Sequence, residues 1–248
     1  MPAPGLALLL PPSEGKASGG GPAPWSPDSG SLGALLGERR RQVVEALEVA
    51  GGGDQKLLGV GGDHLARARA ANRHLLGAPT LPAGERYTGV VWDHLDPGGL
   101  PAAVRRRAGG RVGIVSGLQG LVLMADPVPD YRLKMGARLS PLGVLATWWR
   151  PAVTEAIEVW ARRRVVVDLL PKEHRAAWAP DTAAFAEVIR VDLVEPGPAG
   201  EVRVVGHDAK AAKGLLARHL LLSGGDPRTA LASWSHDRFS LRFDPTVM

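Results

Sequence analysis

The sequence predicts an α/β fold, with a mixed sheet flanked by helices, in one compact domain. Two observations lead to this fold class. Short apolar runs of the length of buried strands recur along the chain, and segments with apolar residues at helical spacing lie between them. The sequence contains no internal repeat and no long linker, so we expect a single domain over residues 1–248.

The stretch from Arg111 to Gly136 is the centre of this prediction. Two apolar runs, separated by a small Gly-containing turn, lead to Asp126 and then to Tyr131 and Arg132. Apolar runs bounded by Gly and Pro indicate buried strands and packed turns. Polar residues that follow such strands stand where α/β folds bind their ligands. The alternative is that Asp126 caps a helix and that Arg132 is a solvated charge.

The N-terminal run Leu6–Leu10 predicts a buried strand. A Gly-rich loop follows it and contains Ser13, Glu14 and Lys16. A strand followed by such a loop invites a phosphate-binding interpretation, but the Walker A spacing GxxxxGK[ST] is absent. Backbone amides of the loop can still form an anion-binding nest. Residues 18–31 predict a flexible loop.

The next two elements are a helix and a glycine hairpin. Leucine and valine recur at helical spacing over Leu32–Val49, and three glycines end that helix. Two short helical stretches then flank Gly59, Gly61 and Gly62, as in a helix-hairpin-helix whose backbone amides approach a DNA phosphate. An ordinary helix–helix turn explains the glycines equally well, because Leu65 stands where the motif has a small residue.

The rest of the chain continues the alternation of strands and helices. Lys210 and Lys213 open a helix three residues apart, so they share a face and can bind one anion together. The remaining expected segments are a loop over 77–86, a strand or turn over Tyr87–Leu95, a helical region over Leu100–Arg107, a helix over Leu145–Trp160, and strands over Arg163–Leu170, Ala184–Val194, Glu201–Val205 and Trp234–Phe243.

Composition excludes several classes of protein. Hydrophobic residues make up 45% of the 248 residues and charged residues 22%, as in ordinary globular proteins. No apolar run is long enough to span a bilayer, and no signal-peptide pattern is present, so we expect a monomeric cytoplasmic protein without membrane contact. The absence of cysteine excludes disulfides and thiolate sites, and the histidine spacing matches no metal motif, so neither metal nor cofactor is expected. The net charge of +5 permits a nucleic-acid or phosphate partner.

Several segments together resemble the YaaA family, whose members are described as peroxide-stress proteins. The segments keep the family's order and spread over nearly the whole chain. They are LLLPPSEGK (8–16), YTGVVWDHL (87–95), IVSGLQGL (114–121), Asp126, YRLKMG (131–136), VVVDLL (165–170) followed by Lys172 and Glu173, and DAKAAKG (208–214).

The resemblance implies a compact α/β domain that binds double-stranded DNA through a basic cleft and a helix-hairpin-helix, in the context of oxidative stress. The hairpin falls at Gly59–Gly62. The basic motif positions are Lys16, Arg132, Lys210 and Lys213, with Lys134 in the same block as Arg132; the polar or small motif positions are Ser13, Glu14, Ser116, Gly117, Asp126, Tyr131 and Glu173.

The chain departs from the family pattern within its best-matched blocks. Gln119 replaces an aromatic residue, Leu123 and Met124 replace an Arg-Pro pair, and Arg238 stands in place of a terminal glycine. These departures are compatible with a diverged member that has its own ligand.

The residues themselves support a second hypothesis, an enzyme acting on a nucleotide, nucleobase or other small anionic substrate. Glu14, Asp126 and Glu173 are its candidate acids or bases, since carboxylates beside basic groups repel phosphate unless they have another role. A third alternative is purely structural, with Asp126 and Arg132 forming a buried ion pair that fixes the fold.

Overall fold

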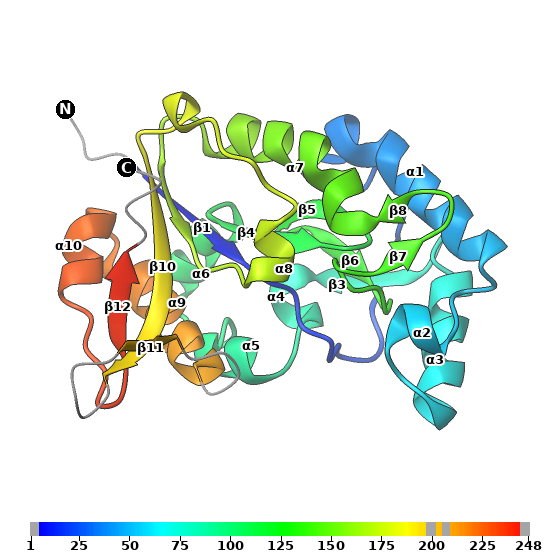
Figure 1. Ribbon diagram of the computed structural model, residues 1–248, viewed down its shortest axis with the longest axis horizontal. Coiled ribbons are helices and arrows are strands. Elements are labelled where there is room, and N and C mark those ends of the chain that lie inside the picture. The colour runs from blue at the N-terminus through cyan, green and yellow to red at the C-terminus, as the bar shows by residue number, and fades with distance from the viewer. Residues whose placement is uncertain (1–4, 197–201, 205–208, 244–248) are drawn as a thin grey trace.

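The fold is built on one mixed sheet, as the sequence predicts. The computed structural model describes residues 5–196, 202–204 and 209–243. The sheet runs in the order β11-β10-β9-β1-β4-β5, and β12 also pairs with β10 (Figure 1). Its strands are β1 (Leu6–Leu10), β4 (Val112–Ser116), β5 (Gly120–Leu123), β9 (Val165–Asp168), β10 (Glu187–Pro196), β11 (Val202–Val204) and β12 (Ser240–Phe243).

Strand β1 lies in the middle of this sheet. It pairs in parallel with β4 on one side and with β9 on the other, and all five of its residues are buried. Strands buried on both faces read as continuous apolar runs, which explains why Leu6–Leu10 lacks alternation. Because β1, β4 and β9 are parallel, the loops that follow them leave the sheet at one edge.

Helices cover both faces of the sheet. Figure 1 shows α1 (Gly33–Val49) and α7 (Leu145–Ala161) above it, and α5 (Val90–Leu95) and α9 (Lys210–Ser223) below it. The predicted helices over Leu32–Val49 and Leu145–Trp160 are therefore confirmed. The tryptophans of α7 serve the core: Trp149 and Trp160 are buried and donate to the carbonyls of Gly117 and Gly110. Helix α6 (Ala102–Gly109) leads into β4, and α10 (Pro227–Ala232) packs on α9.

Two small sheets form outside the strands that the sequence predicts. Strands β2 (Gly21–Pro24), β3 (Pro79–Pro82) and β6 (Pro127–Pro129) make one, and β7 (Arg138–Leu139) and β8 (Gly143–Val144) make the other. Proline and glycine hide these strands from pattern reading, because such residues ordinarily mark loops. Pairing between distant segments creates the β2-β3-β6 sheet, whereas β7 and β8 are neighbours in the chain.

Two buried arginines fix the segment around β2. Arg40 donates to the carbonyls of Pro27 and Ser29, and Arg86 donates to those of Ala17 and Gly19. Both guanidinium side chains are fully buried. Residues 18–31, predicted as a flexible loop, are thus tied to the core by donors that lie outside the segment.

Other boundaries differ from the prediction. Tyr87–Leu95, expected as a strand or turn, contains helix α5, preceded by the short helix α4 (Ala83–Arg86). Gly89, at φ 100°, begins α5, and its amide donates to Asp93 Oδ1. The last strand begins at Ser240, six residues later than expected. The connection expected between the strands Ala184–Val194 and Glu201–Val205 lies mostly outside the described residues.

The glycine hairpin joins two helices, α2 (Gln55–Leu58) and α3 (Gly62–Arg73). Asp54 caps α2 by accepting from the amide of Leu57 at 2.7 Å. Gly59 ends α2 with φ 68°, in the left-handed region that favours glycine. Two helices joined by a Gly-containing turn are therefore present where the sequence predicts them.

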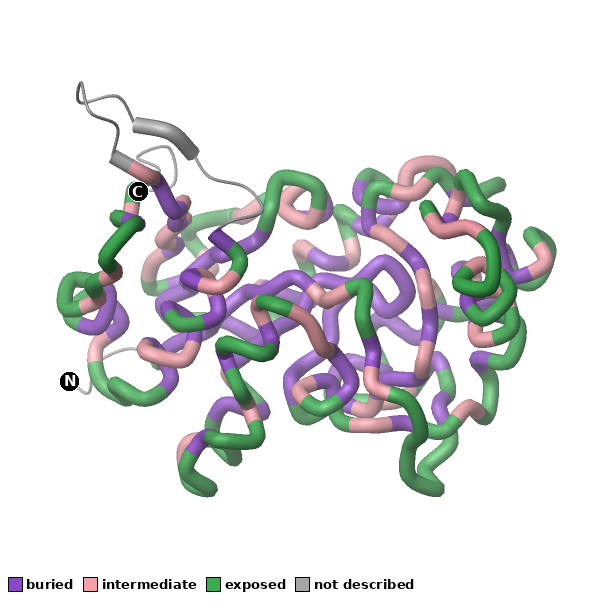
Figure 2. Tube along the Cα trace, turned by 90° about the horizontal axis from the view of Figure 1, so that it is seen from below, coloured by how far each residue is buried: buried purple, intermediate pink, exposed green. Residues whose placement is uncertain are grey.

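Most buried side chains of the described residues belong to one core. Figure 2 shows buried segments running through the middle of the molecule and exposed ones around it. The remaining elements are α8 (Lys172–Arg175) and the single helical turn Thr182–Ala184. Within the described ranges, no helix combines the length and apolar character needed to cross a membrane.

Candidate functional site

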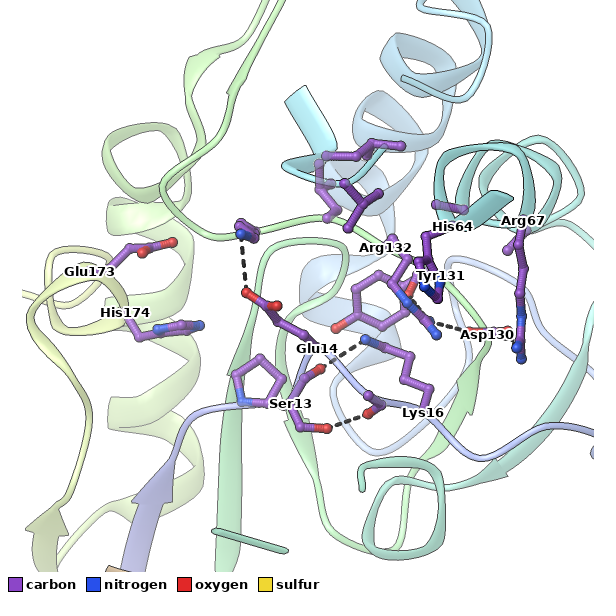
Figure 3. Close-up of a pocket in the computed structure, with 18 residues that line it drawn as sticks. Ser13, Glu14, Lys16, His64, Arg67, Asp130, Tyr131, Arg132, Glu173 and His174 are labelled. Carbon is purple, nitrogen blue, oxygen red and sulfur yellow. Dashed lines mark hydrogen bonds and ion pairs between the residues drawn. The ribbon is translucent and has the colours of Figure 1, made fainter. Parts of the chain in front are cut away.

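A cavity of about 370 Å³ lies at the edge of the sheet where β1 ends. Four segments enclose it: the loop after β1, the α2–α3 hairpin, the segment 130–134 and the start of α8 (Figure 3). Its volume falls in the range of small-molecule pockets. The lining residues are Pro12 to Lys16, Leu58, Val60, His64, Arg67, Ala68, Ala71, Asp130 to Lys134, Glu173 and His174.

The structure brings together about half of the site residues that the sequence singled out. Seven of them line this pocket although they come from three distant parts of the chain: Ser13, Glu14, Lys16, Tyr131, Arg132, Lys134 and Glu173. The hairpin forms a wall of the same pocket through Leu58, Val60 and His64, which surround its glycines in sequence. The predicted polar edge of the sheet is therefore one site.

Other predicted site residues lie elsewhere. Asp126 is buried and accepts from the amide and hydroxyl of Ser31 and from the amide of Leu123. It fastens the loop before α1 to β5 and does not line the pocket. Asp126 and Arg132 do not pair with each other, so the structural alternative of a buried Asp126–Arg132 pair is wrong. Lys210 is exposed at the start of α9, outside the pocket.

Lys16 is the most buried cation of the pocket. Only 9% of the residue is exposed, and its amine donates to the carbonyl of Ser13 at 3.0 Å. The amine also lies 4.1 Å from the ring centre of Tyr131. Burial, assisted by the charge of Arg132, lowers the pKa of Lys16 to about 7. Within the described part of the chain, no carboxylate lies at ion-pair distance from this amine.

A chain of buried hydroxyls lies behind Lys16. Ser116 Oγ is 2.7 Å from the Tyr131 hydroxyl, which is 3.0 Å from the Tyr87 hydroxyl. Burial is the main cause that raises the pKa of Tyr131 and that of Tyr87, so both phenols stay neutral at neutral pH. Ser116 thus positions Tyr131 and does not face the pocket itself. Gly117, next to it, allows a close approach, because a Cβ there would lie 2.7 Å from the carbonyl oxygen of Leu133.

The other cations of the pocket have carboxylate partners. Arg132 pairs with Asp130, and Arg67 lies 3.9 Å from the same carboxylate. Lys134 pairs with Glu14 at 3.1 Å, with both side chains partly exposed. Positive and negative groups therefore lie next to one another along the pocket. The exposed pairs among them contribute little free energy in water.

Asn72 holds the cationic segment in place, and sequence reasoning missed it. Its Oδ1 accepts from the Arg132 amide, and its Nδ2 donates to the carbonyls of Arg132 and Gly52. Asn72 is 1% exposed. An asparagine within a helix carries no sequence signal for this role, because the partner is 60 residues away.

The far end of the pocket is formed by α8. Glu173 accepts from the amide of Gly136 at 2.6 Å and so ties α8 to the segment after Lys134. Burial lowers the pKa of His174 to about 4, so this imidazole is neutral at neutral pH. Its Nδ1 is buried and, among the described residues, has no hydrogen-bond partner.

A second buried polar network lies beneath α8. Asp168, at the end of β9, is fully buried and accepts from Arg175 at 2.8 Å and from the amide of Leu170. Lys213, which the sequence placed on an anion-binding helix face, donates to the carbonyl of Leu169 at 2.6 Å. Burial lowers the pKa of Lys213 to about 8. Lys213 therefore supports the pocket floor and does not line the cavity.

Two of the basic residues on α3 are engaged away from the pocket. Arg69 and Arg73 both donate to the carbonyl of Gly51, which follows α1. Arg67, on the same helix, points toward the pocket and Asp130 (Figure 3). Of the three arginines on α3, only Arg67 therefore lines the cavity.

The departures from the family pattern lie in the core or at the far edge of the sheet. Gln119 is buried and accepts from Trp25 Nε1 at 3.0 Å. Leu123 and Met124 are also buried, and none of the three lines the pocket. Arg238 pairs with Glu195 beside β10. These substitutions act on packing, so they do not by themselves alter the pocket wall.

The arrangement supports binding of an anion beside a buried amine. Across residues 5–196, 202–204 and 209–243, no group of three or more histidine or carboxylate side chains is placed to hold a metal ion. The pocket instead offers Lys16, three further cations and two carboxylates, Glu14 and Glu173, that can accept a proton.

Comparison with known proteins gives concordant matches. The family described as peroxide stress protein YaaA matches residues 6–244. A UPF0246 protein of Streptomyces coelicolor is 39% identical over 224 residues, which is 90% of this chain and 85% of the relative. A UPF0246 protein of Corynebacterium glutamicum is 33% identical over 233 residues, covering 91% of this chain and 89% of the relative.

Proposed function

The chain belongs to the family of peroxide stress protein YaaA, and from this membership and the geometry of the pocket we propose that it binds double-stranded DNA in the response to peroxide. One observation carries the proposal. The α2–α3 hairpin and the cationic residues Lys16, Arg132 and Lys134 border the same cavity. A phosphate backbone that reaches the hairpin therefore meets cations from two other segments.

The exposed cations at the mouth of the pocket are suited to phosphate. The side chain of Arg67 is 62% exposed and that of Lys134 is 42% exposed. Exposed ion pairs contribute little in water, so a phosphate can take the place of Asp130 or Glu14 at small cost. Each phosphate contact made in this way releases condensed counterions and makes the affinity depend on salt.

The test is duplex binding by fluorescence anisotropy at several salt concentrations. We expect log Kd to rise linearly with log salt, and Arg67→Ala to reduce the slope by about 1. Arg106→Ala, on exposed α6 and outside the pocket, is the matched control and should leave the slope unchanged. Absent or salt-insensitive duplex binding contradicts the proposal, as does an equal effect of the two variants.

A second candidate function is an enzyme acting on a small anionic substrate such as a nucleotide or nucleobase. The observation in its favour is that the pocket has the volume of a small-molecule site and contains Glu14, Glu173 and a neutral His174. Calorimetric titration with nucleotides and nucleobases tests it. Binding that Arg132→Ala weakens and that Arg106→Ala does not would support it, whereas duplex binding without any small-molecule binding would exclude it.

A further inference from the structure

Lys16 differs from the other cations of the pocket in its surroundings. Asp130 is engaged by Arg132 and Arg67, and Glu14 is engaged by Lys134. The Lys16 amine has instead a carbonyl, an aromatic face and a neighbouring guanidinium. A buried amine beside other cations is the environment that makes lysine a nucleophile toward carbonyl carbon.

The geometry also exposes this amine to a ligand. Lys16 lines the cavity, and Figure 3 shows its side chain reaching toward the centre between Ser13 and Tyr131. Its hydrogen bond to Ser13 uses one of the three donor positions of a protonated amine. A pKa of about 7 leaves a large fraction of the amine unprotonated at neutral pH, as attack on a carbonyl requires.

We propose that Lys16 forms a Schiff base with the aldehyde of an abasic site in duplex DNA, so that the protein acts as a lyase on this lesion. The inference rests on the proposed binding of DNA. An abasic nucleotide presents an open-chain aldehyde flanked by two phosphates, which suits a nucleophilic amine in a cavity that Arg132 and Lys134 also line. A damaged nucleotide also costs least to turn out of the duplex into a pocket.

The covalent steps balance without an oxidant, reductant or metal. The Lys16 nitrogen attacks the aldehyde carbon C1′, and the carbinolamine loses the carbonyl oxygen as water to give a protonated imine. A base then removes a proton from C2′, a C2′=C3′ double bond forms, and the C3′–O bond breaks to release the strand that carries a 5′ phosphate. Water finally hydrolyses the imine, which frees Lys16 and leaves an unsaturated aldehyde on the other strand end.

Glu14 is the base that the pocket offers for the C2′ proton. It lies two residues from Lys16 on the same loop, and both residues line the cavity. Its partner Lys134 can turn to a phosphate of the bound strand, which releases the carboxylate to accept the proton.

The experiment incubates the full chain with a duplex that contains one abasic site and reduces the mixture with borohydride, which converts an imine to a stable amine. We expect a covalent protein–DNA adduct that peptide mass spectrometry assigns to Lys16, and strand cleavage when borohydride is omitted. Lys16→Arg keeps a positive charge but cannot form the imine, so it should lose both adduct and cleavage, and its duplex binding is measured alongside. Lys16→Met serves as the second variant, and Lys172→Met, at an exposed position on α8, should behave as wild type.

A parallel gel shift separates this inference from the proposed function. Duplex binding without an adduct, or an adduct on another lysine, overturns the Schiff-base inference and leaves DNA binding intact. Absence of duplex binding, together with an adduct formed by 2-deoxyribose 5-phosphate, overturns DNA as the substrate. In Glu14→Gln, an adduct that forms at the wild-type rate with slowed cleavage supports Glu14 as the base, and unchanged cleavage excludes it.

Discussion

Asn72 hydrogen-bonds both backbone groups of Arg132, accepting from its amide at 2.9 Å and donating to its carbonyl at 2.8 Å. The two residues belong to different walls of the pocket, α3 and the segment 130–134. This pair therefore sets the distance between the hairpin and the cationic segment. A side chain that does not touch the cavity thus determines its width.

Replacing Asn72 tests this role. Asn72→Ala removes three hydrogen bonds and leaves buried backbone groups unpaired, so we expect the free energy of unfolding to fall by about 2–4 kcal/mol. Urea unfolding measures the loss, and duplex affinity should fall with it. Ala70→Asn, at an exposed position on α3, is the control and should cost only the difference in helix propensity, about 0.5 kcal/mol. Equal losses in the two variants contradict the role of Asn72.

The buried amine of Lys16 predicts a dependence of stability on pH. Below about pH 7 the amine is protonated in the folded and unfolded states, and burial of the charge costs stability. From about 7 toward its ordinary pKa of 10.5, the folded protein releases the proton while the unfolded chain retains it. The unfolded state then binds more protons, so the free energy of unfolding rises with pH, by up to about 1.4 kcal/mol per pH unit.

The measurement compares urea unfolding of wild type and Lys16→Met across that range. Lys213 adds a rise of the same sign from about pH 8, and it does so in both proteins. The free energy of unfolding should therefore rise more steeply with pH for wild type than for Lys16→Met. Lys172→Met should show the wild-type dependence. Parallel wild-type and Lys16→Met curves would show that the pKa of Lys16 is close to its ordinary value.

Gly117 and Gly110 differ in the space available for a Cβ atom, so alanine substitutions at the two positions provide a steric test. A Cβ on Gly117 would lie 2.7 Å from the carbonyl oxygen of Leu133, which is backbone and cannot turn away. Gly117→Ala should therefore lower the free energy of unfolding by about 2 kcal/mol and displace the segment that carries Lys134. Gly110 has open space and a right-handed φ of −102°, so Gly110→Ala should be neutral or stabilise by about 0.5 kcal/mol. Thermal unfolding of both proteins gives the comparison, and a Gly117→Ala protein as stable as wild type would refute the close approach.

Replacing Asp168 should lower the free energy of unfolding more than replacing Asp192, whose side chain is less buried. It is fully buried and accepts from Arg175, so Asp168→Asn leaves buried cations without their counter-charge and should cost about 3–5 kcal/mol. Asp192 also pairs with Arg175, at 3.7 Å, but its side chain is 27% exposed. Asp192→Asn should therefore cost less than about 1 kcal/mol. Chemical denaturation measures both losses. A larger loss for Asp192→Asn than for Asp168→Asn would show that Asp192 is the residue that holds α8 in place.

The sequence predicted the elements that bury continuous or periodic apolar surface. The strands at Leu6–Leu10 and Val165–Asp168 and the helices α1 and α7 follow from hydrophobic pattern alone. Strands β2 and β3 could not be predicted, because proline and glycine fill them and their pairing joins residues more than 50 positions apart. Helix α5 was missed because a short segment rich in valine and aromatics has strand propensity, which packing against α9 overrides.

The sequence identified several residues of the site but not the contacts that they make. Motif resemblance selected Lys16, Arg132, Lys134, Glu14 and Glu173, and the structure gathers all five around one cavity. Asp126 shows the limit of this reasoning, because an acid after a strand can equally fasten a loop, as it does here by binding Ser31. Residues such as Asn72 and Asp130 gain their roles only from contacts across the fold.

The central position of β1 has a consequence for synthesis of the chain. This strand is synthesised before both of its neighbours, which are Val112–Ile114 on one side and Val165–Asp168 on the other. More than 150 further residues must therefore be synthesised before both edges of this strand, four leucines and an alanine, are paired. Such long-range parallel pairing is slow to form and leaves apolar strands open to other chains. Nascent chains halted before β9 should thus depend on chaperones that bind short apolar segments near the N-terminus.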